Sequence, residues 1–132
     1  MRNPLCPKSR EDLIAFCLSF MSVYEDYPFD ANWTAMRHKG NDKTFAFIFE
    51  HEGQCWCNVK VTPVAAQFWR ESFPSIQPAY HMNKTHWIGL PLDESVPNDV
   101  FERILTDSYL LTAPKKKTAA KGRNSGTEGV KR

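Results

Sequence analysis

The pattern of residues 44–61 constrains the fold of this chain more than any other feature. Residues 44–51 read Thr-Phe-Ala-Phe-Ile-Phe-Glu-His, and residues 55–61 alternate between the two faces of an extended chain. Runs rich in aromatic and β-branched residues predict strands. Only a short turn containing Glu52 and Gly53 separates the two runs, so we expect them to pair as antiparallel neighbours.

Three more strands are predicted, at residues 33–38, 76–82 and 85–92. The first precedes a turn cluster at 39–42, so it extends the strands at 44–61 into a three-stranded meander.

Three helices are predicted, over residues 10–22, from Pro63 to Pro74, and over residues 97–111. Ser9 and Thr62 carry side chains that cap helix N-termini, and Pro63 suits a first helical position. The apolar residues expected to face the core are Leu13, Phe16, Cys17 and Phe20, then Val64, Phe68 and Trp69, then Val100, Ile104, Leu105 and Tyr109.

The order of these elements is therefore α-βββ-α-ββ-α. It predicts an α+β fold of two layers, with helices on one face of an antiparallel sheet. The other face is expected to be free, and to be the face at which the domain binds.

The chain divides in composition at residue 112. Its 132 residues are 42% hydrophobic and 13% aromatic, enough for one packed domain over residues 1–112. Residues 113–132 contain no aromatic side chain and are predicted to be a disordered basic tail.

Charge follows the same division. Residues 113–132 hold seven basic residues and one acid, a net charge of +6, whereas the whole chain carries +2 and residues 1–112 therefore carry −4. A polyanion site on the domain must then be a local cluster of cations. No apolar run approaches the length of a membrane span, and the first residues lack the pattern of a secretion signal, so we expect a cytoplasmic protein.

Basic and aromatic residues interleave in three segments that coincide with predicted strands and turns. Cations near turns contact phosphates and exposed aromatic rings stack on bases, while the plainer interpretation is a solvated face above core aromatics. The candidate DNA- or ligand-binding residues are Trp33, Arg37, His38, Lys39 and Lys43, then Asn58 and Lys60, then Tyr80, His81, Asn83, Lys84, His86 and Trp87.

Metal and catalytic interpretations have less support. Cys55 and Cys57 form a close cysteine pair with no second pair to complete a zinc site, so reduced thiols used in packing are expected. His81 and His86 have no nearby acid that would complete a metal site. We predict no cofactor, no metal and no catalytic constellation, although a histidine acid or base remains a third possibility.

Several short strings resemble the MmcQ/YjbR family of small bacterial proteins. They are Glu25-Asp26-Tyr27-Pro28-Phe29-Asp30, Trp33, Arg37-His38-Lys39, Lys43-Thr44-Phe45-Ala46, Asn58-Val59-Lys60, Pro78-Ala79-Tyr80-His81-Met82-Asn83-Lys84-Thr85-His86-Trp87-Ile88, Leu92-Asp93 and Ser108-Tyr109-Leu110-Leu111-Thr112. The resemblance covers roughly residues 9–112. It implies a CyaY-like, or secretion-chaperone-like, fold and a double-wing DNA-binding function. The family's frataxin-like relatives bind iron through acidic ridges, but the first helix here has only Glu11 and Asp12 as acids, so iron is not inferred.

Two hypotheses follow. In the first, wing turns at 39–43 and 81–84 contact DNA phosphates, Tyr80, Asn83 and Trp87 lie near them, and the tail adds non-specific attraction. In the second, the domain binds a small molecule or a protein, with a homodimer through the sheet as one form. Trp33, Tyr80, His81, His86 and Trp87 would then line a pocket.

Overall fold

The computed structural model describes residues 9–115. Along the chain lie α1 (Arg10–Leu18), β1 (Val23–Asp26), β2 (Thr34–His38), β3 (Thr44–His51), β4 (Gln54–Lys60), α2 (Pro63–Ser72), β5 (Gln77–Pro78), β6 (Trp87–Pro91) and α3 (Asn98–Thr112). The strands form one sheet in the order β1-β2-β3-β4-β6-β5, and every neighbouring pair is antiparallel. The predicted α+β class with an antiparallel sheet is therefore confirmed.

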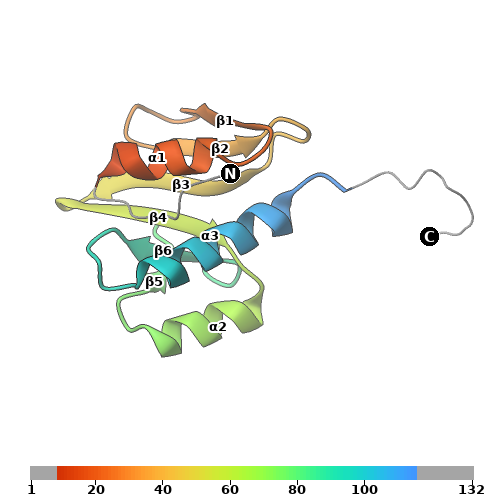
Figure 1. The fold of residues 1–132 in the computed structure, drawn as a ribbon. Helices are drawn as coiled ribbons and strands as arrows, with labels where there is room; N and C mark the ends of the chain where they lie inside the picture. Colours follow the sequence, from red (N-terminus) through yellow and green to blue (C-terminus); the bar gives the residue numbers. More distant parts are fainter. Residues whose placement is uncertain (1–8, 116–132) are drawn as a thin grey trace, which may run out of the picture.

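Figure 1 shows α1 and α3 in front of the same face of the sheet, with α2 near β5 and β6. α1 contacts β1, β2 and β3, and α3 contacts β3 and β4. Alternate residues of the strands point into this helix-covered core, among them Met36, Ile48, Cys57, Val59 and Leu90. The residues between them form the opposite face, which no helix covers in the described part of the chain and which we call the open face.

Two helices begin at the residues that the sequence predicts as caps. The Ser9 side chain accepts a hydrogen bond from the Asp12 backbone N–H at 3.1 Å, and Thr62 does the same for Ala65 at 3.2 Å. Pro63 is the first residue of α2. These contacts satisfy N–H groups that have no partner within the helix.

The predicted element order misses one strand. β1 pairs with β2 at the edge of the sheet, so four strands, not three, precede α2. α1 ends at Leu18 rather than near residue 22, because the chain turns before β1 and Ser22 adopts a left-handed conformation with φ of 59°.

The strand predicted over 76–82 and the core face of α2 also need correction, whereas the strand predicted over 85–92 is found as β6. The strand predicted over 76–82 is reduced to Gln77–Pro78, because proline has no N–H to donate to a ladder and the chain turns away after it. In α2, Val64 is 80% exposed and Phe68 57% exposed, while Ala66 is buried. The helix therefore presents its small residue to the core, with Trp69 packed beside it.

A bulge in β3 shapes the end of the sheet. Met36 pairs with Ala46 but Arg37 pairs with Thr44, so Phe45 is an extra residue without a partner in β2. Both Phe45 and Ala46 consequently lie in the core. The carbonyl of Phe45 accepts a hydrogen bond from the Ser108 hydroxyl of α3 at 2.6 Å.

The end of α3 is attached to the turn between β2 and β3. Asn41 Nδ2 donates to the Thr112 carbonyl at 3.0 Å, and a Cβ on Gly40 would lie 2.6 Å from Pro114 Cγ, so glycine permits this close approach. The predicted tail otherwise lies outside the described residues. None of the helices within residues 9–115 is long and apolar enough to cross a bilayer.

His38 provides a pH test of the core. Its ring is buried, 2.9 Å from Thr112 Oγ1, and burial lowers the pKa of His38 below its usual value. The unfolded chain then binds the proton more readily than the folded one, so stability is complete above a pH of about 6.5 and falls as the pH drops below it. Urea unfolding between about pH 7.5 and 5 checks this. The fall in unfolding free energy with decreasing pH should become smaller in His38→Gln and should persist in His86→Gln, an exposed control. The same dependence on pH in all three proteins would contradict the prediction.

Candidate functional site: a basic cleft at the end of the sheet

A cleft of about 570 Å³ opens at the edge of the sheet where β2 and β4 end and where β3 and β6 begin. Its walls come from the β2–β3 turn, the link between β4 and α2, the start of β6 and the last turn of α3. The lining residues are Arg37, Asp42, Lys43, Thr44, Lys60, Val61, Thr62, Pro63, His86, Trp87, Leu111 and Thr112. Five of the residues singled out in the sequence thus meet in one place: Arg37, Lys43, Lys60, His86 and Trp87.

The cations of this basic cleft differ in how far they are neutralised. Arg37 Nε forms an ion pair with Asp26 at 3.0 Å, and its Nη1 donates to the Asp42 carbonyl at 2.9 Å. Within residues 9–115, Lys43 and Lys60 have no carboxylate at ion-pair distance. Their two ammonium groups are therefore the charges available to an anion that enters the cleft.

Trp87 adds an aromatic surface to the same walls. Its indole is half-buried, and the Lys60 ammonium lies over it, 5.6 Å from the ring centroid. α2 starts at this wall, with Thr62 as its cap and no acid in its first turn, so its amide dipoles add to the positive potential. The cleft combines cations, backbone dipoles and a π-face, the groups that bind phosphates and bases.

The open face carries a cluster of stacked rings next to the cleft. Trp33 stacks on Phe49 at 4.0 Å between centroids, Tyr80 lies 4.1 Å from His51, and His81 lies 4.0 Å from Tyr80. Phe49 is buried beneath them. We call Trp33, His51, Tyr80 and His81 the aromatic shelf. The open face is thus only partly free, because the loops at 27–33 and 79–86 lie over its middle.

Asn58 lies under this cover and makes no contact with solvent. It occupies the open face between Phe47 and Gly89, and its Nδ2 donates to the Tyr80 carbonyl at 3.0 Å. Its Oδ1 is buried and has no hydrogen-bond partner among the described residues. A Cβ on residue 89 would approach that oxygen to 3.0 Å, which explains why glycine stands there. Asn58 holds the loop at Tyr80 in place.

Two of the candidate binding residues, Lys84 and Asn83, hold the 79–86 loop together. Lys84 Nζ donates to the carbonyls of Ala79 at 2.7 Å and Met82 at 3.4 Å. Asn83 Oδ1 accepts from the backbone N–H groups of Thr85 and His86. These side chains set the loop conformation, including the left-handed φ of 62° at His81.

Two other candidates from the β2–β3 region lie away from the cleft. His38 is in the core under α3, only 2% exposed, so a ligand at the surface does not reach its ring. Lys39 is exposed in the turn but does not line the cleft.

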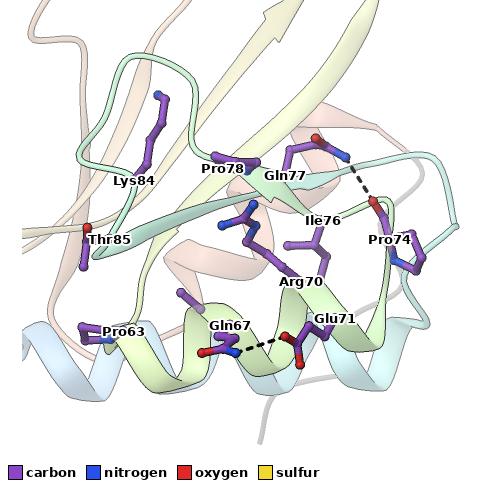
Figure 2. A pocket seen from close by; sticks show the side chains of 11 residues that line it. Pro63, Gln67, Arg70, Glu71, Pro74, Ile76, Gln77, Pro78, Lys84 and Thr85 are labelled. Carbon is purple, nitrogen blue, oxygen red and sulfur yellow. Dashed lines mark hydrogen bonds between the residues drawn. The ribbon is translucent and has the colours of Figure 1, made fainter.

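A second hollow, of about 580 Å³, lies between α2 and β5. Figure 2 shows Arg70 reaching from α2 toward Gln77 and Pro78, while Gln67 donates to Glu71 along the helix at 3.1 Å. This hollow meets the basic cleft at Pro63, which lines both. Its other cation, Lys84, donates to backbone carbonyls, so Arg70 is the cation left in this hollow, compared with Lys43 and Lys60 in the basic cleft.

The three described cysteines serve the core. Burial raises the pKa of Cys55 to about 11 and those of Cys17 and Cys57 further, so all three are protonated thiols near neutral pH. Cys6 lies outside the described residues. In residues 9–115, no three side chains of His, Cys, Asp or Glu gather as a metal site would require.

Sequence reasoning missed several members of this surface. Phe47, Phe49 and His51 belong to the open face, and their alternation with Ala46 and Ile48 in the sequence is a signal that would have found them. The ion pair between Arg37 and Asp26 had no such signal, because it depends on the pairing of β1 with β2.

The fold and this surface define a small α+β domain with an open antiparallel sheet and a basic cleft at its end. The family model described as YjbR matches residues 18–111, and the chain belongs to the YjbR family. The resemblance noted in the sequence is thereby confirmed.

Relatives and solved structures agree with this assignment. The chain is 28% identical over 98 residues to the uncharacterised protein YjbR of Escherichia coli (strain K12), covering 74% of this chain and 81% of that protein. It is 27% identical to the uncharacterised protein YyaQ of Bacillus subtilis (strain 168), covering 79% and 98%. A Deinococcus radiodurans crystal structure with a DUF419 domain superposes with a TM-score of 0.71 at 28% identity, covering 84% and 81%. A crystal structure of a Pseudomonas syringae protein also reaches 0.71, at 26% identity, covering 79% and 98%.

Proposed function

We propose that this domain binds nucleic acid, DNA in the first place, at the basic cleft, and that it acts as a binding module rather than as an enzyme. One observation carries the proposal: Lys43, Lys60 and His86 come from three separate segments and line one cleft together with Trp87, whose ring lies beneath the Lys60 ammonium. Residues 1–112 carry a net charge of −4, so this convergence is local and not a consequence of a generally basic surface.

The arrangement matches what a polyanion with bases requires. Lys43 and Lys60 supply charge for backbone phosphates, and Trp87 supplies a face for a base or sugar. The basic C-terminal segment begins beside the cleft, because Thr112 lines it and the chain continues from there into residues 113–132. Its seven cations would strengthen binding without adding sequence preference.

Charge reversal in the cleft tests the proposal. We expect Lys43→Glu and Lys60→Glu each to weaken binding of a short labelled DNA by roughly tenfold, and each to reduce the slope of log affinity against log salt by about one. Fluorescence anisotropy at several salt concentrations measures both quantities. Deleting residues 116–132 in a parallel protein separates the contribution of the tail.

Arg103→Glu is the matched control, since it makes the same change in charge on the exposed side of α3, where Arg103 pairs with Asp107. It should leave DNA affinity within about twofold of the parent. An equal loss of DNA affinity in the control and in the cleft variants would show that only the net charge of the protein matters. Unchanged DNA affinity in the cleft variants would place the DNA outside the cleft. No affinity of the parent for DNA would leave a small-molecule or protein ligand on the open face as the alternative.

A further inference from the structure

The aromatic shelf is partly exposed to solvent beside the basic cleft. The rings of Trp33 and Tyr80 are nearly parallel, 17° apart with centroids separated by 6.4 Å, and Tyr80 is 40% exposed. His51 is 37% exposed at its side chain and lies parallel to Tyr80 within 28°. Exposed rings in common orientation are a platform on which flat groups stack.

This platform is continuous with the cleft through one buried ring. The centroid of the Phe47 ring lies 6.0 Å from that of Trp33 and 5.9 Å from that of Trp87. Aromatic contacts therefore run from Trp87, among the cations, to the shelf on the open face. A ligand whose charged group lies in the cleft can therefore extend over the open face from Trp87 toward Trp33.

The shelf is also held in a fixed position. His81 keeps its ring 6.2 Å from Trp33 with a left-handed backbone, which a non-glycine residue adopts only under constraint from its surroundings. Lys84 and Asn58 supply that constraint through the carbonyls of Ala79 and Tyr80. The rings are preorganised, so a ligand that stacks on them does not have to order the loop.

We infer that the open face takes unpaired bases, so that the preferred ligand is a single strand whose phosphates lie in the basic cleft and whose bases stack on the aromatic shelf. This inference rests on the proposed function. In a duplex the faces of the bases are already stacked on one another and only their edges are accessible. A single strand exposes its base faces, and stacking on aromatic side chains tolerates any sequence.

The full chain tests this with three labelled probes of one length: a single strand, the matching duplex, and a single strand of abasic residues. We expect the single strand to bind roughly tenfold more tightly than the duplex. The abasic strand should bind about tenfold more weakly than the normal one, because it keeps the phosphates and loses the stacking.

Tyr80→Ala should weaken single-strand binding by about tenfold and leave duplex and abasic binding unchanged. Tyr80→Phe keeps the ring and should bind like the parent, which separates stacking from folding. Phe68→Ala, which removes an exposed ring on α2, is the matched control and should have no effect.

The outcomes separate the two proposals. Equal affinity of the parent protein for the single strand and the duplex would overturn the single-strand inference. If Lys43→Glu then weakens binding to every probe, the cleft remains the binding site. No affinity for any probe would overturn both. A dimer that dissociates in Tyr80→Ala, with no preference for the single strand, would show that a second copy covers the shelf and would also overturn the inference.

Discussion

Ser108→Ala is expected to lower the free energy of unfolding by about 2 to 5 kcal/mol, although it removes a single oxygen atom. The Ser108 hydroxyl is fully buried between β3 and β4. It donates to the Phe45 carbonyl at 2.6 Å and accepts from the Lys60 backbone N–H at 2.9 Å. The ladder between β3 and β4 ends at the pair of Ala46 and Val59, so Ser108 connects the next two residues, Phe45 and Lys60. Alanine would leave the buried Phe45 carbonyl and the partly buried Lys60 N–H without this partner.

Urea unfolding of the parent and the variant measures this loss. Ser72→Ala is the control: its hydroxyl donates to the Phe68 carbonyl at 2.7 Å on the exposed side of α2, where water replaces it. The control should change stability by less than about 0.5 kcal/mol. A loss below about 1 kcal/mol in Ser108→Ala would mean that the ends of β3 and β4 can rearrange to pair their free groups.

Arg10→Met is expected to cost about 3 kcal/mol and to loosen the loop that carries Trp33. Arg10 is the first residue of α1, where a cation opposes the helix dipole. Its guanidinium nevertheless donates to Asn32 Oδ1 at 3.1 Å, to the Asn32 carbonyl, to Thr34 Oγ1 at 2.9 Å and to the Ile48 carbonyl at 3.1 Å. One side chain thus connects α1, β3 and the loop before β2, and methionine preserves only its aliphatic part.

Two measurements check the Arg10 prediction. Urea unfolding should show the loss of stability, and hydrogen exchange should become faster at residues 27–33. Arg10→Lys should recover less than half of the loss, because a single ammonium does not reach acceptors on both sides. Arg103→Met, which breaks the exposed pair with Asp107, should stay within about 0.5 kcal/mol of the parent. Full recovery by lysine would show that the positive charge alone matters.

Local signals in the sequence predicted the elements best where a short-range contact defines them. Ser9 and Thr62 cap their helices through N–H groups three residues ahead, so both starts were correct. The strand at Thr44–His51 was correct because its composition strongly favours extended structure. Where an element depends on a distant partner the prediction was wrong: β1 is only four residues long and exists through its pairing with β2.

The face of α2 illustrates a different limit. Helical spacing correctly groups Val64 with Phe68, but that pair faces solvent. Ala66 faces the core instead, because a small side chain lets the helix approach β6 closely. Spacing fixes which residues share a face of a helix, whereas the shape of the surface beneath decides which face is buried.

The candidate site divides in the same way. The sequence identified the cations and rings, and five of them meet in the basic cleft. It did not separate Lys43 and Lys60, which face the cleft, from Lys84 and Asn83, which form the 79–86 loop. Lys84 and Asn83 form hydrogen bonds with backbone groups of their own loop, and these bonds cannot be predicted without the conformation of the loop.

Sequence patterns were enough to predict the α+β class, the starts of two helices, the central strands, the family and the residues from which a site would be built. These follow from propensities, side-chain alternation and contacts within a few residues. The three-dimensional fold was needed to show which cations are paired, that Phe45 is bulged, that His38 is in the core, and that the rings of the open face adjoin the basic cleft. Each of those features depends on groups far apart in the chain, whose positions are set by strand register and helix packing.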